Sequence, residues 1–287
     1  MILWMWLGIF LIVVIGVVML IIGLIDGNRY VVKEEHFALS KLAKPCRFVM
    51  LSDLHGKVYG ANNERVIEDI RRANPDFVVI VGDLITSKQG AGIDAGVHLV
   101  KELSKDFRIY YAMGNHETKL KVRREQFGKL FEELMHAIEG PNVTVLADAA
   151  CDIEEYNVCM TGLELERSYF ARLKKRLLPQ EVLEEHIGVA HRDVCNILLA
   201  HNPEYFEAYV KWGADLVLAG HVHGGIMRLP VVGGVISPSL ELFPKYDGGV
   251  FRHENSVMLL GRGMGAHTIP LRFFNPAELY VITLDVR

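Results

Sequence analysis

Hydrophobic and polar positions divide this sequence into one long apolar segment and a series of short apolar runs. Residues 2–25 contain no charged side chain and consist mainly of Leu, Ile, Val and Phe. A helix of this length, rising about 1.5 Å per residue, is long enough to cross the roughly 30 Å hydrocarbon core of a bilayer. A basic start and a small-residue cleavage site, typical of a signal peptide, are absent. We therefore expect residues 1–28 to form an uncleaved, single-pass transmembrane anchor.

Beyond residue 45, short continuous apolar runs alternate with stretches of helical spacing. Continuous apolar runs are typical of strands buried on both faces. Five runs predict such strands, over residues 48–52, 77–81, 109–113, 196–200 and 216–219. The charged stretch 29–45, which ends at Pro45, predicts a linker between the anchor and a single domain over 46–287.

The remaining patterns complete the expected fold. Helical spacing extends from a cap at Asn62 or Asn63 to just before Pro75, and over about 93–104, 119–139 and 168–185. Strand patterns occupy 143–146, 151–156, 158–163 and 279–284, and 250–260 predicts a hairpin. Strands with helical crossovers, followed by hairpins, predict an α/β fold with two mixed sheets face to face and helices outside.

Composition narrows the class of protein. The 31 Lys and Arg residues against 35 Asp and Glu residues give a net charge of −4, so we expect no nucleic-acid partner. The four cysteines lack the close spacing of a zinc site, and we expect buried thiols rather than disulfides. Basic residues follow the apolar segment but do not precede it, which favours a cytoplasmic domain by the positive-inside rule.

Potential metal ligands follow each of the five predicted buried strands. Gly220-His221-Val222-His223-Gly224-Gly225 follows the last of them, and two imidazoles at i and i+2 point the same way. Taken by itself, this motif is also compatible with a polar turn that carries two solvated histidines. The other strand ends carry similar residues, in Asp53-Leu54-His55, Gly82-Asp83, Gly114-Asn115-His116-Glu117 and His201. Because all five strand ends carry side chains with oxygen or imidazole ligands, together they favour a metal site.

This order of motifs resembles the calcineurin-like metallophosphoesterase family, whose pattern is Asp-x-His, Gly-Asp, Gly-Asn-His-Asp/Glu, a lone His and Gly-His-x-His. The resemblance covers about residue 47 to the C-terminus, and every ligand position is filled. It implies a four-layer α-β-β-α sandwich for residues 46–287 and two divalent ions, with Mn, Zn or Fe suited to oxygen and nitrogen ligands. By the resemblance, Asp53, His55 and His223 hold the first ion, Asn115, His201 and His221 hold the second, and Asp83 bridges both.

The charge of such a centre indicates the class of substrate. Two divalent ions, two carboxylates and a bridging hydroxide leave about one positive charge, which suits a phosphoester, and metal binding makes hydroxide available at neutral pH. The resemblance implies that His116 lies beside the phosphate and protonates the leaving oxygen, oriented by Glu117. His267 and Arg272, in and after a glycine-rich loop, are expected either to touch substrate or to shape the rim of the site.

We therefore expect a dinuclear metal hydrolase, most simply a phosphodiesterase or pyrophosphohydrolase that acts at the cell membrane on a substrate that can be lipid-linked. One alternative is a hydrolase of the UDP-2,3-diacylglucosamine type, which some anchored relatives represent. A rival from another class is a non-catalytic scaffold with the same fold. Anchored relatives are thought to face outward, whereas the basic residues favour the cytoplasm, so the side of the membrane stays open.

Overall fold

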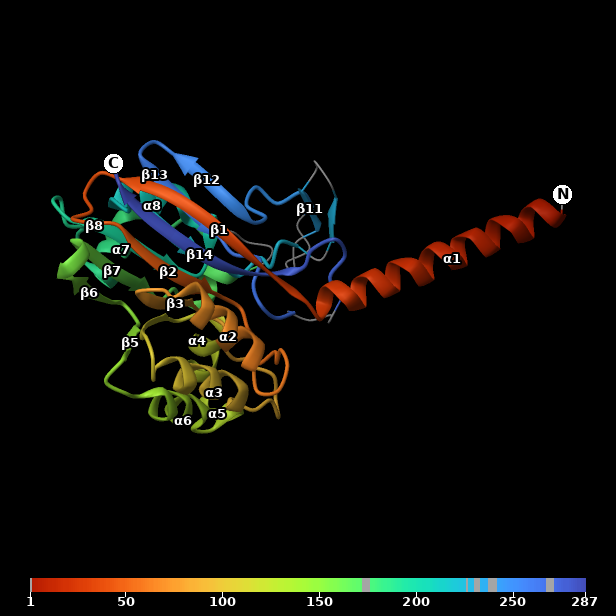
Figure 1. The fold of residues 1–287 in the computed structure, drawn as a ribbon, viewed down its shortest axis with the longest axis horizontal. Helices are drawn as coiled ribbons and strands as arrows, with labels where there is room; N and C mark the ends of the chain where they lie inside the picture. The colour runs from red at the N-terminus through yellow and green to blue at the C-terminus, as the bar shows by residue number, and fades with distance from the viewer. Residues whose placement is uncertain (1, 172–175, 226, 230–232, 237–241, 267–270) are drawn as a thin grey trace.

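A computed structural model describes residues 2–171, 176–225, 227–229, 233–236, 242–266 and 271–287. Two six-stranded sheets pack face to face, and one long helix projects from an end of the domain (Figure 1). Helices pack on the outer face of each sheet, and a hydrophobic core fills the space between the sheets. The expected four-layer α-β-β-α architecture is confirmed.

The first sheet has the strand order β1-β14-β2-β3-β4-β5. β14 runs antiparallel to β2, and all other neighbours are parallel. The central strands are continuous apolar runs because both of their faces are covered. The strands are β1 (Tyr30–Leu39), β2 (Cys46–Leu51), β3 (Phe77–Val81), β4 (Arg108–Ala112), β5 (Val143–Leu146) and β14 (Ala277–Val286).

The second sheet has the order β12-β13-β9-β8-β7-β6, and its outer pairs β12–β13 and β6–β7 are antiparallel. β12 and β13 form the expected hairpin. A separate two-stranded ribbon is made by β10 (Met227–Leu229) and β11 (Gly233–Ile236). The strands of the second sheet are β6 (Ala149–Ile153), β7 (Val158–Leu163), β8 (Cys195–Ala200), β9 (Leu216–Ala219), β12 (Gly249–His253) and β13 (Ser256–Leu260).

Helices cover the outer faces. The expected helix over 119–139 is instead three short helices, interrupted at Arg123 and at Gly128, whose φ is 61°. The expected helix over 168–185 is reduced to a 3₁₀ turn and α7, and residues 172–175 lie outside the described chain. The helices of the domain are α2 (Glu64–Ala73), α3 (Asp94–Leu103), α4 (Asn115–Val122), α5 (Arg124–Phe127), α6 (Leu130–Ile138), α7 (Gln180–Ile187) and α8 (Phe206–Trp212), with 3₁₀ turns at η1 (Glu154–Tyr156), η2 (Arg167–Phe170) and η3 (Pro203–Tyr205).

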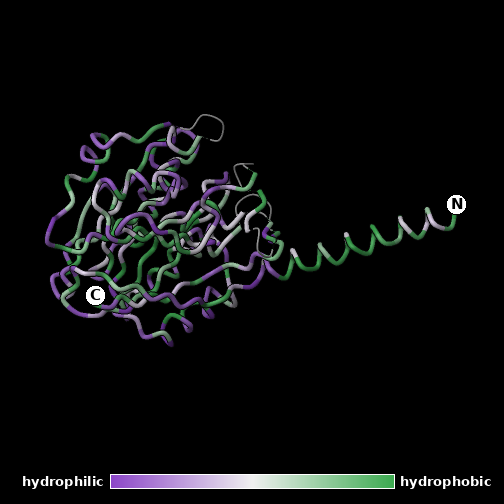
Figure 2. The backbone as a smooth tube through the Cα atoms, turned by 90° about the horizontal axis from the view of Figure 1, so that it is seen from above, coloured by the Kyte–Doolittle hydropathy of each residue, from purple (hydrophilic) through white to green (hydrophobic). Residues whose placement is uncertain are grey.

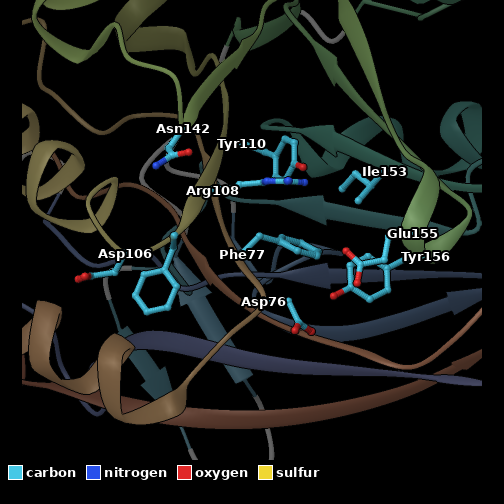
Figure 3. A pocket seen from close by; sticks show the side chains of 10 residues that line it. Asp76, Phe77, Asp106, Arg108, Tyr110, Asn142, Ile153, Glu155 and Tyr156 are labelled. Carbon is cyan, nitrogen blue, oxygen red and sulfur yellow. The ribbon is translucent and has the colours of Figure 1, made fainter.

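The parallel strands place their carboxyl ends together, and all the expected ligands follow these ends. A polar hollow of about 300 Å³, lined by Asp76, Arg108 and Tyr110 among others, lies instead where β3 and β4 begin (Figure 3). It is therefore at the opposite edge of the sheet from the expected ligands.

The segment predicted as a linker is largely a strand. β1 pairs with β14 over ten residues, from Tyr30 opposite Ala277 to Leu39 opposite Val286. Phe37 and Leu39 are buried in the core between the sheets. The charged residues 33–35 obscured the strand in the sequence, and an edge strand accommodates such charges because one side faces water.

The apolar helix α1 (Ile2–Gly27) exposes its side chains along most of its length, and it is long and apolar enough to cross a membrane. Its last turn is built into the domain. The N–H of Arg272 donates to the Gly23 carbonyl at 3.2 Å, and the N–H of Asn275 donates to the buried Asp26 carboxylate at 3.2 Å. A Cβ at Gly23 would lie 2.7 Å from the ring of Phe273, so the helix and this loop are in close contact.

These contacts predict where the chain can be shortened. A fragment that begins at Asp26 keeps β1, whereas one that begins at Lys44 loses it and removes Phe37 and Leu39 from the core. We expect the shorter fragment to unfold with a free energy about 3 to 6 kcal/mol lower, the value of burying two such side chains. Urea unfolding of both fragments measures the difference, and equal midpoints and slopes would contradict the structural role of β1.

Candidate metal centre

The expected ligands occupy an unusual backbone conformation. Five of the seven have a left-handed φ: Asp53 (52°), His55 (49°), Asp83 (53°), His221 (75°) and His223 (52°). This conformation costs a non-glycine residue roughly 1 to 2 kcal/mol. Such strain persists where the surrounding structure imposes it and is concentrated at functional sites. Here it marks the sharp turns that follow the carboxyl ends of β2, β3 and β9.

Glycines in the same motifs allow the turns to approach one another. A Cβ at Gly114 would overlap the carboxylate of Asp83, and a Cβ at Gly220 would overlap the carboxylate of Asp53. Each glycine therefore leaves space for a carboxylate from another strand end. The close packing of the strand ends therefore explains why these two motifs contain a glycine.

Asp53, His55 and His223 converge as the first group of candidate ligands. Each offers one ligand atom, and these atoms all lie within 4.8 Å of one another. Nε2 of His223 is 3.4 Å from Asp53 Oδ1 and 3.0 Å from Nε2 of His55. These three residues are the ones expected to hold the first ion.

Asp83, His201 and His221 form a second group with the same spacing. Nδ1 of His201 donates to the Val81 carbonyl at 2.8 Å, and this contact directs Nε2 toward Asp83 Oδ2, 3.2 Å away. The same Oδ2 is 3.7 Å from His55 Nε2, so Asp83 lies between the two groups. Asn115 Oδ1 is buried and accepts no hydrogen bond within the described residues. A buried amide oxygen that accepts no hydrogen bond is suited to act as a metal ligand.

The electrostatics of the cluster require positive charge. Burial raises the pKa of Asp53 to about 6, whereas nearby imidazoles, chiefly His201, overcome burial and hold the pKa of Asp83 well below its ordinary value. Burial alone would lower the pKa of His201, but Asp83 and Asp53 together raise it to about 10. A proton on His201 offsets part of the negative charge of Asp53 and Asp83. Divalent cations bound between these residues would offset the same negative charge. The donor set therefore fits two such ions.

His116 lies beside these groups but is held differently. Its Nδ1 accepts the backbone N–H of Ser87 at 2.7 Å and lies 3.0 Å from the Ser87 hydroxyl. We therefore assign the proton of the neutral ring to Nε2, which is 4.0 Å from Asp83 Oδ2. Burial lowers the pKa of His116, which also favours the neutral ring. A protonated Nε2 suits a hydrogen-bond donor better than a metal ligand.

Glu117 binds backbone groups of the two turns beside His116. Its Oε2 accepts the backbone N–H groups of Asp83 and Gly114, both at 2.9 Å, and so ties the turn after β3 to the start of α4. Burial and repulsion from Asp83 raise the pKa of Glu117 to about 7. Ser87 contacts the ring of His116 directly and so helps to orient it. The sequence gives no signal for Ser87, which lies in the loop after Asp83.

Arg272 packs against the glycine-rich loop. Its guanidinium is buried and donates to the carbonyls of Arg262 (2.8 Å), Gly263 (3.2 Å) and Gly265. It thus shapes the glycine-rich loop from inside, whereas its expected contact with substrate stays a prediction. His267, the other residue expected at the rim, lies outside the described residues.

Two residues that the sequence did not indicate support the site. The ring of Phe170 packs edge-on against His221, with centroids 5.0 Å apart. Nδ2 of Asn275 donates to the carbonyls of His223 and Gly225, both at 2.8 Å, while its own N–H donates to Asp26 of α1. Asn275 therefore connects a candidate metal ligand to the end of the apolar helix.

Comparisons with known proteins agree with this geometry. A family model described as calcineurin-like phosphoesterase matches residues 46–225. An uncharacterised metallophosphoesterase of Helicobacter pylori is 26% identical over 91% of this chain, which spans 66% of the length of that relative. The metallophosphoesterase YkuE of Bacillus subtilis is 26% identical over 83% of the chain and 78% of its own length. A zebrafish (Danio rerio) transmembrane protein with a metallophosphoesterase domain is 25% identical over 83% of the chain and 53% of its own length.

Solved structures give more distant matches. The Thermus thermophilus protein TT1561 superposes with a TM-score of 0.46 at 11% identity, covering 76% of this chain and 90% of its own. A dimetal phosphatase from Danio rerio superposes with a TM-score of 0.44 at 13% identity, covering 84% of this chain and 92% of its own.

The position of Asn275 generates a prediction. Asn275→Ala leaves the carbonyls of His223 and Gly225 without donors, so the turn that carries His223 should loosen. We expect Mn affinity to fall about 10- to 100-fold, as for other residues that orient metal ligands. Calorimetric titration with Mn measures this change. Asn142→Ala is the matched control, because its amide donates to Ser104 at the surface. Equal affinities in the two variants would contradict the proposed support.

Proposed function

This chain belongs to the calcineurin-like phosphoesterases, a family of metal-dependent phosphoester hydrolases, and we propose that it hydrolyses a phosphodiester or pyrophosphate bond at a membrane surface. The observation that carries the proposal is the convergence of the candidate ligands from both sheets. The rival hypothesis of a non-catalytic scaffold predicts missing ligands, and all seven expected ligands are present.

The protein's part is to hold the ligands in place and in the right protonation state. Two ions, of Mn, Zn or Fe, would supply Lewis acidity and an activated water when bound. Asp53, His55 and His223 would hold one ion, and Asn115, His201 and His221 the other. Asp83 would contact both, because a carboxylate has two oxygens and its Oδ2 lies within 4 Å of a histidine from each group.

His116 acts on the substrate as a hydrogen-bond donor. Because Nδ1 accepts from the Ser87 amide, the proton available to the substrate is on Nε2. We propose that this N–H donates to the oxygen of the leaving group, where negative charge develops as the P–O bond breaks. A neutral imidazole holds this proton tightly, so the role is stabilisation of charge more than complete proton transfer.

The apolar helix supports action at a membrane. α1 would span the bilayer once, and its last turn is fixed to the domain through Asp26 and Gly23. The site is thereby held at one distance from the membrane, which suits a lipid-linked phosphoester. A UDP-2,3-diacylglucosamine-type precursor is one substrate of this chemistry.

A direct assay tests the proposed reaction. Full-length protein saturated with Mn should hydrolyse a nitrophenyl phosphodiester, lose the activity to a chelator and regain it with Mn. Asp83→Ala should bind clearly fewer than two equivalents of metal and remain inactive after Mn is added back. Full activity of Asp83→Ala, or fewer than two equivalents in the wild-type protein, would overturn the two-ion centre. Parallel assays with a phosphomonoester and a UDP-lipid identify the preferred class.

The role of His116 predicts an effect that depends on the leaving group. His116→Asn should keep the metal content while lowering turnover of an alkyl phosphodiester about 10²- to 10³-fold, the usual cost of removing one such donor. A nitrophenyl diester should lose less, because nitrophenolate carries its charge without help. His221→Asn should slow both substrates alike, with partial rescue by excess Mn. Equal losses for the two substrates in His116→Asn would instead indicate a contact to a non-bridging phosphoryl oxygen.

A further inference from the structure

Ten large hydrophobic side chains outside α1 are exposed in the described residues, and four of them are Leu or Phe side chains between residues 229 and 274. These four are Leu229 (41% exposed), Leu242 (64%), Phe243 (62%) and Phe274 (45%). We refer to these four residues as the collar. Contiguous exposed apolar surface on a folded domain commonly marks an interaction site.

Backbone contacts place the collar beside the end of α1. Phe274 follows Phe273, whose ring contacts Gly23 of α1 and whose carbonyl accepts the N–H of Arg228 at 3.0 Å. Leu229 is the next residue of β10 after Arg228. Both residues are therefore within a few positions of a direct contact with the helix.

The other two collar residues extend from the same ribbon. Leu242 forms a bridge with Ile236 of β11, and the N–H of Phe243 donates to the carbonyl of Val235 at 2.9 Å. In Figure 1, β11 lies at the end of the domain from which α1 projects. Figure 2, turned by 90°, also shows hydrophobic segments of the domain close to the base of the helix.

We propose that the collar inserts into the interfacial region of the bilayer that α1 spans, giving the catalytic domain a second contact with the membrane. The inference rests on the proposed anchoring by α1. The surface around the base of a spanning helix faces the membrane, and exposed Leu and Phe side chains there are favoured by burial at the boundary between headgroups and acyl chains.

Charge at the same junction suits this partner. Arg29 is half exposed although it pairs with Asp26 at 2.7 Å, and Lys57 donates to Asn28 at 2.6 Å, so both cations lie where α1 meets the domain. Lys and Arg side chains beside a membrane helix attract anionic headgroups. The collar and these two cations together present the apolar and basic groups of an interfacial membrane contact.

The collar also bears on the class of substrate. Lys57 follows Asp53 and His55 in the same turn, and Asn275 connects α1 to His223. The ligands of the first ion are thus attached to the junction that faces the bilayer. A phosphoester carried in the headgroup region of an amphiphile would meet the site in a fixed orientation, whereas a water-soluble substrate would gain nothing from the collar.

Fluorescence from single positions tests the proposal in the full-length protein. Each variant carries one added cysteine labelled with the fluorophore NBD, in a Cys151→Ser background because the other three cysteines are buried. The label at Phe243→Cys probes the collar, and the label at Val14→Cys probes the spanning part of α1. Leu177→Cys is the control, because Leu177 is 86% exposed and does not belong to the collar. The proteins are reconstituted in phosphatidylcholine and phosphatidylglycerol vesicles with or without spin-labelled lipids.

The three labels separate the two claims. A collar in the interface predicts that the label at position 243 loses roughly half of its emission to spin labels placed near the headgroups, and that the label at 177 loses none. Quenching at position 14 by spin labels deep in the acyl chains, without quenching at 243, would overturn the collar and leave the anchor intact. Absence of quenching at position 14 would overturn the anchor and the collar with it.

Activity provides a second readout. Leu242→Asn with Phe243→Asn should lower turnover of a vesicle-bound phosphoester about tenfold, because orientation at the bilayer is lost. Turnover of a soluble nitrophenyl diester should be unchanged, which also shows that the variant is folded. The matched control is Leu177→Asn with Val189→Asn, two exposed apolar residues elsewhere. Equal rates on vesicles for the collar and control variants would overturn the proposal.

Discussion

Two buried carboxylates determine much of this structure. Asp53 and Asp83 follow neighbouring strands of the first sheet and are almost completely removed from water. Buried charges of one sign are costly unless opposite charge is supplied close by. The imidazoles of His201, His221 and His223 come from the second sheet, so compensation requires the two sheets to meet in one alignment. The apolar core between the sheets stabilises that alignment, which brings the carboxylates of one sheet next to the imidazoles of the other.

The strained turns that carry the ligands are held mainly by backbone groups. The Gly265 N–H donates to the Asp53 carbonyl at 2.6 Å, and the His55 N–H donates to the Asp83 carbonyl at 2.9 Å. Glu117 and Arg272 bind further backbone amides and carbonyls of the same loops. A left-handed conformation at five ligands is therefore maintained by many weak constraints from distant segments.

This arrangement explains which features the sequence could predict. The strands that lead to the ligands are continuous apolar runs, and their polar ends follow a recognisable order, so the fold could be predicted and the seven candidate ligands could be named. β1 was missed because the charges at 33–35 hide an edge strand. Ser87 contacts a histidine ring 29 residues away, and Asn275 binds carbonyls about 50 residues away, so no local pattern reports these contacts. For Glu117, the motif indicated importance, but only the structure shows which groups it binds.

The pairing of β1 has a consequence for how the protein is made. β1 follows α1 directly, yet its neighbour in the sheet is β14, which also separates it from β2. A ribosome produces β1 before every other strand described here and β14 after all of them. The edge of the first sheet therefore stays incomplete while the rest of the domain emerges, and β1 has no partner in the sheet until β14 is made. Completion of the fold therefore depends on a pairing between segments far apart in the sequence, the kind of contact that is formed late because its loop-closure entropy must be overcome first.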